Sequence, residues 1–324
     1  MLQMSKGWLA AAAIAAAGLL SPALAQDYPA KTVKIIVPFG AGGPADLYAR
    51  FIGQQLQDSL KQSFVIEDRP GAGSIIGTGE AAKSDPDGYT LLMMSNTHTV
   101  NETLRPNKPF QLMRDFVPVA PINYSDLIMV VHPSVPANNL KEFLALLKSK
   151  PSALNYASSG PGTPYHMASE LFKAMSGTDL VHVPHKASGD ARTAVLGGHV
   201  QMMIDAITTT APIVQGGQLR ALGTTGKERS ILLPDVPTIS EAGVSGYEAT
   251  IWLGIMAPAG TPKAIVDKLN TEINKVLARA DVKDSWGKQG AVPIIMSPAL
   301  FDTYLRDDIE KWAKVIQTAG LKPQ

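Results

Sequence analysis

The feature that most limits the fold of this chain is a regular alternation of short apolar runs with helix-length amphipathic segments. Residues 33–37 are apolar and β-branched except for Lys34, which predicts a buried strand, and Leu47, Phe51, Leu56 and Leu60 follow at helical spacing. The same order continues with strands expected at 63–67 and 89–94 and a helix at 73–83. This alternation predicts a parallel or mixed sheet flanked by helices.

A similar pattern restarts in the middle of the chain. Helices are expected at 140–148, 164–175, 262–278 and 298–319, and strands at 127–131, 154–157, 180–183, 200–204, 221–224 and 251–256. A connection rich in proline and glycine covers 233–246. We therefore expect two similar α/β lobes with a cleft between them.

The N-terminus has the pattern of a secretory signal peptide. Lys6 precedes an apolar run at 9–20, and Ala23-Leu24-Ala25 has the small-x-small pattern of a cleavage site. The run is too short to span a bilayer as a mature helix. Residues 1–25 are thus predicted to be a signal peptide cleaved after Ala25, which would release the mature protein into the periplasm.

Composition excludes several classes of protein. The chain has 29 basic and 28 acidic residues, and loss of Lys6 with the signal peptide leaves no excess of either sign. A nucleic-acid-binding protein would carry a basic excess. The absence of cysteine excludes disulfides, thiolate metal sites and a cysteine nucleophile. After the signal peptide no apolar run is long enough for a membrane helix.

Two glycine-rich turns carry the strongest functional signal. The first is Phe39-Gly40-Ala41-Gly42-Gly43-Pro44-Ala45-Asp46, between an expected strand and an expected helix. Glycine leaves room for a ligand beside the backbone, and the amide groups and dipole of a helix start favour an anion. The second turn covers 156–164, where Ser158, Ser159 and Thr163 add hydroxyl groups. One turn in each lobe suggests a grip on opposite ends of a carboxylate ligand.

A dinucleotide site is the alternative interpretation of the first turn. Gly40-x-Gly42-x-x-Ala45 satisfies the dinucleotide fingerprint, and Glu67 or Asp68 lies where a ribose-binding acid is expected. This would indicate an NAD-dependent oxidoreductase. Export away from the cytoplasmic nicotinamide pool argues against it, and a single dinucleotide site leaves the second turn unexplained.

Other catalytic and metal-binding motifs are missing from the sequence. It contains no G-x-S-x-G nucleophile elbow and no H-E-x-x-H metal motif. We expect no metal, no cofactor and no catalytic residue. Among the scattered histidines, His166 and His185 are of interest because each lies near a predicted cleft loop.

Several segments, taken in order along the chain, resemble the receptors of tripartite tricarboxylate transporters, also called the Bug family. In the first half they are the run from Val37 to Gly43 with Asp46 and Arg50, the run from Asp68 to Gly73 with Gly77, and Asp85-Pro86-Asp87-Gly88-Tyr89-Thr90. In the second half they are Ser158-Ser159-Gly160 with Gly162, Thr163, His166 and Glu170, then Val183-Pro184 with Lys186, Gly197-Gly198-x-Val200, Leu219-Arg220-Ala221-Leu222, Pro234-x-Val236-Pro237-Thr238, Glu241-Ala242-Gly243 and Gly246-Tyr247-Glu248.

The resemblance implies a type II periplasmic binding protein fold, with residues 26–125 plus 250–324 in lobe 1 and 126–249 in lobe 2. It implies a non-enzymatic, monomeric receptor that captures a small organic carboxylate, either a di- or tricarboxylate or an aromatic acid. The receptor would deliver this ligand to the membrane permease subunits of a tripartite tricarboxylate transporter. No nucleic-acid partner is expected.

The resemblance also implies which residues bind the ligand. The lobe 1 clamp would be Phe39, Gly40, Ala41, Gly42, Gly43 and Asp46, and the lobe 2 clamp would be Ser158, Ser159, Gly162, Thr163 and His166. Ser95, Asn96 and Thr97 would line the cleft, and Asp205 would contact the far end of the ligand. This chain has His185-Lys186-Ala187 where the family commonly has Tyr-Lys-Gly, so His185 would add a hydrogen bond or a positive charge near the ligand.

Overall fold

The computed structural model describes residues 28–318 and 320–323, so the predicted signal peptide and its cleavage site lie outside the described residues. One lobe contains the elements β1 (Val33–Val37), α2 (Pro44–Leu60), β2 (Phe64–Asp68), α3 (Ile75–Ala82), β3 (Thr90–Ser95), α4 (Asn96–Leu104), α5 (Leu112–Asp115), β9 (Thr250–Pro258), α10 (Lys263–Ala278), α11 (Ala280–Gly287), β10 (Ala291–Pro293) and α12 (Pro298–Thr318). The other contains α6 (Leu140–Ser149), β5 (Asn155–Ser158), α7 (Pro164–Ser176), β6 (Val181–Pro184), α8 (Ser188–Leu196), β7 (Met202–Ala206), α9 (Ile207–Gln215) and β8 (Arg220–Thr224).

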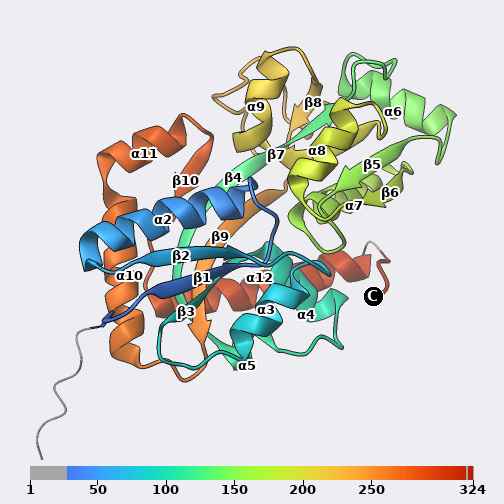
Figure 1. The fold of residues 1–324 in the computed structure, drawn as a ribbon. Helices are drawn as coiled ribbons and strands as arrows, with labels where there is room; N and C mark the ends of the chain where they lie inside the picture. Colours follow the sequence, from blue (N-terminus) through green and yellow to red (C-terminus); the bar gives the residue numbers. More distant parts are fainter. Residues whose placement is uncertain (1–27, 319, 324) are drawn as a thin grey trace, which may run out of the picture.

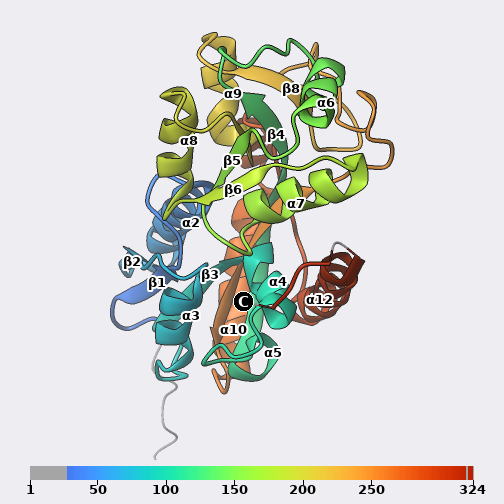
Figure 2. The same cartoon turned by 90° about the vertical axis from the view of Figure 1, so that its right-hand side faces the viewer.

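A single long strand, β4 (Phe116–Val131), runs through both lobes (Figures 1 and 2). The strand order is β2-β1-β3-β9-β4-β7-β5-β6, and β8 and β10 also pair with β4. β1 is parallel to β2 and β3, whereas β9 is antiparallel to both β3 and β4. The predicted two-lobed α/β fold is therefore confirmed, with a mixed sheet.

The pairing of β4 indicates where one lobe passes into the other. Residues 116–126 of β4 pair with β9, and from Leu127 onward the partners are β7 and β8. The return strand β9 begins at Thr250, which pairs with Asp126. The lobe limits 26–125 plus 250–324 and 126–249 stay a prediction, and we use them below as lobe 1 and lobe 2.

The core follows the alternation of side chains along the strands. In β1, Val33, Ile35 and Val37 pack with α2 and α10, and Ile36 packs on the opposite face with residues of α3 and α12. The same alternation divides the lobe 2 segment of β4, because Leu127 and its i+2 neighbours face α6 and α7 whereas Ile128 and Val130 face α8 and α9. In each lobe the sheet is thus covered by helices on both faces, as Figure 1 shows.

The largest departure from the sequence-based expectation is the length of β4. Only its last five residues were expected as a strand, whereas the strand has 16 residues. Pro118 and Pro121 obscure the earlier part, because proline cannot donate to a ladder. The structure accommodates them at two irregularities in the register with β9, between Pro118 and Ala120 and between Pro121 and Asn123.

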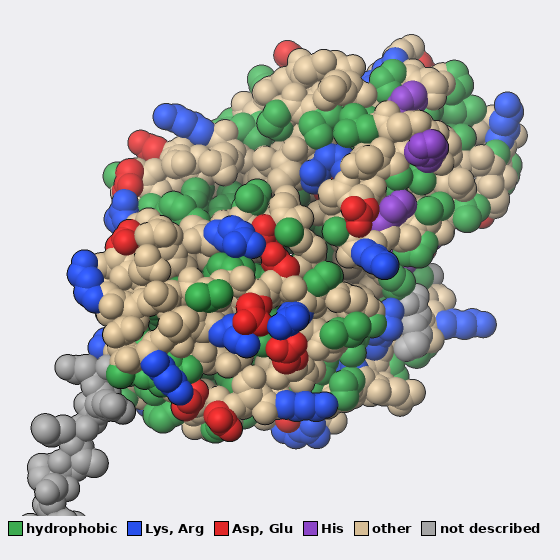
Figure 3. All heavy atoms as spheres, in the orientation of Figure 1, with side chains coloured by type: hydrophobic (Ala, Val, Ile, Leu, Met, Phe, Trp, Pro, Cys, Tyr) green, Lys and Arg blue, Asp and Glu red, His purple; other side chains and the backbone are tan. Residues whose placement is uncertain are grey.

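The surface shows no region of one dominant charge on the face drawn in Figure 3, where acidic and basic side chains lie next to one another. Ion pairs such as Arg50–Asp68 and Lys34–Glu67, with N···O distances of 3.0 and 3.1 Å, are partly exposed. Pairs of this kind contribute little to stability. Within the described ranges, no helix has both the length and the apolar character needed to cross a membrane.

A small apolar cluster joins the lobes. Met167 of α7 is fully buried, and it packs with Val100 and Leu104 of α4 and with Trp312 and Ile316 of α12. The helix α7 belongs to lobe 2, whereas α4 and α12 belong to lobe 1. Burial of this side chain therefore depends on the lobes being closed on each other.

We expect the substitution Met167→Ala to lower the free energy of unfolding in urea by about 2 to 5 kcal/mol, because truncating a buried methionine removes apolar contacts and leaves a cavity. The control is Met175→Ala on the same helix, whose side chain is 41% exposed. It should change stability by less than about 0.5 kcal/mol. Equal effects of the two substitutions would contradict the assigned packing.

Candidate functional site

A cavity of about 160 Å³ lies between the lobes. Lobe 1 contributes the loops β1–α2 and β2–α3, the end of β3, and Ile251 and Leu253 of β9. Lobe 2 contributes the loops β5–α7 and β6–α8. Both glycine-rich turns singled out from the sequence therefore face the same space.

The N-terminal ends of five helices meet at this cavity. The residue that precedes the first turn of each helix lines it, namely Gly43 for α2, Ser74 for α3, Ser95 for α4, Thr163 for α7 and Ala187 for α8. The first amide groups of a helix have no partner within the helix, and each helix start carries a partial positive charge. Three such ends come from lobe 1 and two from lobe 2.

The side chains at these helix starts leave the amide groups available. Only Ser95 caps its helix, by accepting a hydrogen bond from the Thr97 amide at 3.2 Å. Gly43 and Ala187 have no side-chain oxygen, and neither Ser74 nor Thr163 accepts a capping bond. An anion in the cavity would therefore take the place of the missing caps.

The charges of the lining favour the same kind of ligand. Lys186 and His185 lie at the wall of the cavity, and none of the described residues that line it is aspartate or glutamate. Phe39, Ile251 and Leu253 add apolar surface. The site thus combines donors and positive charge with an apolar wall, which suits an organic anion with a hydrocarbon body.

Glycines allow the lobes to approach each other at the cavity. A Cβ atom on Gly40 would lie 2.3 Å from the Cβ of Ala187, and one on Gly73 would lie 2.5 Å from the carbonyl oxygen of Pro161. A Cβ atom on Gly162 would lie 2.7 Å from Oδ1 of Asn101. Each contact joins one lobe to the other, so the structure represents the closed form and these positions admit no side chain in it.

The structure brings seven of the sequence-predicted site residues to the lining of the cavity. They are Phe39, Gly40, Gly43, Ser95, Ser159, Thr163 and His185. Because they come from both turns and both lobes, one ligand can touch residues of each lobe.

The remaining lobe 1 residues of the predicted site shape the loops instead of lining the cavity. Asp46 is buried, accepts a hydrogen bond from the Gly42 amide at 2.8 Å and pairs with Arg50 at 2.6 Å. Gly42, with φ of 74°, and its neighbour Ala41 are exposed. These contacts fix the turn that presents Gly40 and Gly43.

Two further residues act at the start of α4. Asn96 donates from Nδ2 to the carbonyl oxygen of Thr250 at 3.0 Å, which ties α4 to the beginning of β9. Thr97 is buried and supplies the amide that Ser95 caps. Their side chains therefore serve the junction of α4 with β3 and β9.

In lobe 2, Ser158, Gly162 and His166 form hydrogen bonds that shape the β5–α7 loop, and none of the three lines the cavity. Asp205 is fully buried behind α8, where Oδ2 accepts from Nε of Arg192 and from Oγ1 of Thr210, both at 2.7 Å. The ion pair holds α8 against β7. Asp205 therefore supports the helix whose N-terminus reaches the cavity, and it lies outside the lining.

The loop β2–α3 is the part of the site that sequence reasoning missed. Gly71, Ala72, Gly73 and Ser74 all line the cavity, and all have positive φ angles, of 136°, 49°, 62° and 78°. Such backbone is unfavourable for alanine and serine, and it concentrates at functional sites. The sequence does contain a signal for this loop, because Gly71 and Gly73 stand where an expected strand leads into an expected helix. The two glycine-rich turns were identified from the same kind of pattern.

Comparison with known proteins gives consistent matches along the chain. Residues 48–321 match the family described as "Tripartite tricarboxylate transporter family receptor". Protein BugT of Bordetella pertussis is 37% identical over 311 residues, which is 95% of each chain. The structure of R. palustris Rpa4515 with adipate has a TM-score of 0.89 and 33% identity, covering 92% of this chain and all of that one. MatC (Rpa3494) from Rhodopseudomonas palustris with bound malate has a TM-score of 0.84 and 31% identity, covering 89% of this chain and all of that one.

The buried ion pair behind α8 gives a test of the site's support. We expect Asp205→Ala to lower the free energy of unfolding by about 3 to 5 kcal/mol, because it leaves the largely buried guanidinium of Arg192 without its partner. The control is Asp267→Ala, which breaks an exposed pair with Lys263 and should cost less than about 1 kcal/mol. Denaturation in urea measures both, and a small loss for Asp205→Ala would contradict the assigned role.

Proposed function

Since this chain belongs to the tripartite tricarboxylate transporter receptor family, we propose that it captures a small dicarboxylate between its lobes and delivers it to a membrane permease of that transporter type. Periplasmic binding proteins of this family have the type II two-lobed fold, and this chain shares it. We propose that it acts in the periplasm as a monomer, after export directed by residues 1–25.

The observation that carries the proposal is the convergence of five helix N-termini from two lobes on one cavity without carboxylate side chains. Each helix start acts as roughly half a positive charge, and Lys186 adds a full one. A carboxylate that touches both lobes has contacts in the closed state that the open state lacks. Binding therefore shifts the population toward closure by the difference in affinity.

The chemistry of the lining supports a dicarboxylate with an aliphatic body. Adipate and malate, present in the related structures, each carry two carboxylates. The apolar surface of Phe39, Ile251 and Leu253 suits methylene groups between two anionic ends. The proposed ligand contacts are the seven predicted residues that line the cavity, together with Ser74 and Lys186.

Capture without chemical conversion is part of the proposal. The family consists of solute-binding receptors, which are not enzymes. For the dinucleotide alternative, the acidic residues that would hold a ribose are engaged elsewhere, because Asp68 pairs with Arg50 and Glu67 pairs with Lys34. Gly40, the first glycine of the fingerprint, also lies against Ala187 of the other lobe.

A thermal-shift and calorimetry screen tests the ligand class. We expect adipate or malate to raise the melting temperature with saturating concentration dependence, with about 2.7 kcal/mol of stabilisation at a hundredfold excess over Kd. Hexanoate matches adipate in length and lacks one carboxylate, so it should bind far more weakly. Citrate and terephthalate test the tricarboxylate and aromatic alternatives. Binding of NAD with no response to any acid would sink the proposal.

The closure step has its own test in Gly40→Ala. We expect this substitution to weaken binding of the acid found in the screen by tenfold or more, because its Cβ would overlap Ala187 in the closed form. The control is Gly189→Ala in α8, where an added Cβ meets no atom within 4 Å. It should leave the affinity within about twofold of the unsubstituted protein. Equal affinity of the two variants would contradict closure as the basis of binding.

A further inference from the structure

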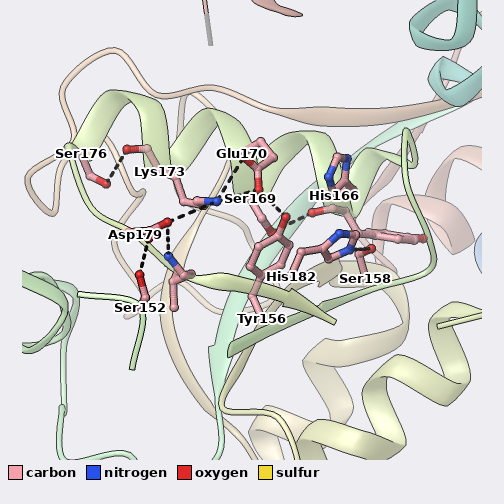
Figure 4. Close-up of polar contacts among 12 residues, drawn as sticks. Ser152, Tyr156, Ser158, His166, Ser169, Glu170, Lys173, Ser176, Asp179 and His182 are labelled. Carbon is pink, nitrogen blue, oxygen red and sulfur yellow. Dashed lines mark hydrogen bonds and ion pairs between the residues drawn. The ribbon is translucent and has the colours of Figure 1, made fainter. Parts of the chain in front are cut away.

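Two histidine rings lie directly behind the β5–α7 loop and are not part of the cavity lining. Figure 4 shows the ring of His166 of α7 close to that of His182 of β6, and His182 lies between Tyr156 and Ser158. The ring centroids of the two histidines are 4.5 Å apart, and His182 stacks on Tyr156 at 4.8 Å with an interplanar angle of 13°. His166 is buried and His182 is partly buried.

Both rings form hydrogen bonds that determine the shape of the loop. Nδ1 of His166 accepts from the Gly162 amide at 3.2 Å. Nε2 of His182 lies 2.6 Å from Oγ of Ser158, and that same oxygen accepts from the Gly160 amide at 3.1 Å. One histidine nitrogen thus bonds the loop backbone directly at Gly162, and the other reaches it at Gly160 through the hydroxyl of Ser158.

The surroundings of the pair leave little tolerance for added positive charge. Tyr156 donates from its hydroxyl to Glu170, and Glu170 also accepts from Nζ of Lys173 at 3.0 Å. Lys173 of α7 and Arg105 at the end of α4 both disfavour a proton on His166, and His166, Lys173 and His185 disfavour one on His182. Glu170 has the opposite effect and favours a proton on His182.

We propose that His166 and His182 are positioning residues that hold the lobe 2 anion-binding loop in shape only while both rings are neutral. The inference rests on the proposed function in one respect, since it takes the β5–α7 loop to be an anion-binding loop. Protonation of His166 at Nδ1 removes the acceptor for the Gly162 amide. Protonation of both rings places two positive charges 4.5 Å apart.

The direction of the pH effect follows from burial. Desolvation lowers the pKa of His166 and of His182 from 6.5 to about 4. The folded protein therefore keeps both rings neutral where an unfolded chain would be protonated. The stability that this provides is present above pH 6.5 and is lost as the pH falls toward 4. Near pH 4 the folded protein itself takes up the protons, and the Gly162 amide loses its acceptor on His166.

The first experiment needs no ligand. In protein labelled with ¹⁵N-glycine, the amide signals of Gly160 and Gly162 are followed from pH 7 to the lowest pH at which the protein stays folded, together with the histidine ring signals. We expect both amide signals to move with the midpoint of the ring signals, and in His166→Asn we expect the Gly162 movement to disappear. Amide signals that do not change position as the histidine rings titrate would overturn the proposal.

Variants separate positioning from a general structural role. His166→Asn and His182→Gln place an uncharged amide near the former Nδ1 and Nε2, whereas His166→Ala removes the acceptor. We expect His166→Ala to weaken adipate binding at pH 7 by about three- to tenfold, as for loss of one hydrogen bond, and His166→Asn to recover most of that loss. His199→Asn, an exposed histidine on another loop, is the control.

The pH profile of adipate affinity gives the second readout. Adipate gains protons itself in this range, so the unsubstituted protein is compared with the double variant His166→Asn, His182→Gln at each pH. Between pH 7 and pH 4, where each ring is half protonated, we expect the unsubstituted protein to lose about two- to fourfold more affinity for adipate than the double variant loses. Parallel profiles would overturn the proposal. If adipate binds at no pH, the proposed ligand is wrong, and the glycine signals still decide the role of the histidines.

Discussion

The structure depends on helix N-termini that face each other across one cavity. In lobe 1 the parallel strands β1, β2 and β3 each lead directly into a helix, so α2, α3 and α4 begin at the same edge of the sheet. In lobe 2, β5 and β6 do the same for α7 and α8. The antiparallel strands β4 and β9 pass between the lobes and bring these two edges together. Unpaired amide groups from both sides would be costly to bury together, and an anion removes that cost.

Closure brings the backbones of the two lobes close together. This close approach explains why glycine occurs at several positions of the cavity loops better than turn geometry does. Gly40 and Gly73 meet Ala187 and Pro161 of the other lobe at distances that exclude a Cβ atom. Gly42, in the same turn as Gly40, has a positive φ and open space around it. Glycine is therefore required at position 40 because the other lobe lies too close for a side chain, and it is favoured at position 42 because the local backbone has a positive φ. The buried side chain of Met167 adds an apolar contact that also exists only when the lobes are closed.

Much of this could be predicted from the sequence, because strand–turn–helix order fixes where turns lie. Both predicted turns reach the cavity for that reason. The direction of individual side chains could not be predicted. Asp46 and Asp205 occupy the expected places in the chain, yet each turns toward a neighbouring arginine, because the ion pair stabilises the buried carboxylate. The helix α4 was not expected from the sequence, because Val100 and Leu104 are its only apolar residues and its other buried residues are threonines, asparagines and a histidine.

Recognition through main-chain amides separates two properties that side-chain recognition would combine. In the proposed mode of binding, amide groups at helix starts would hold any carboxylate, so the anchoring part of the site would depend on backbone shape and would tolerate changes in ligand. Selectivity would then depend on the side chains of the remaining lining, which are Phe39, Ile251 and Leu253 on the apolar side and His185 with Lys186 on the polar side. Backbone shape in turn depends on residues one step behind the cavity, such as Asp46 in lobe 1 and Ser158 in lobe 2. A substitution in that supporting layer would alter affinity for every ligand alike, whereas one in the lining would alter the choice among them.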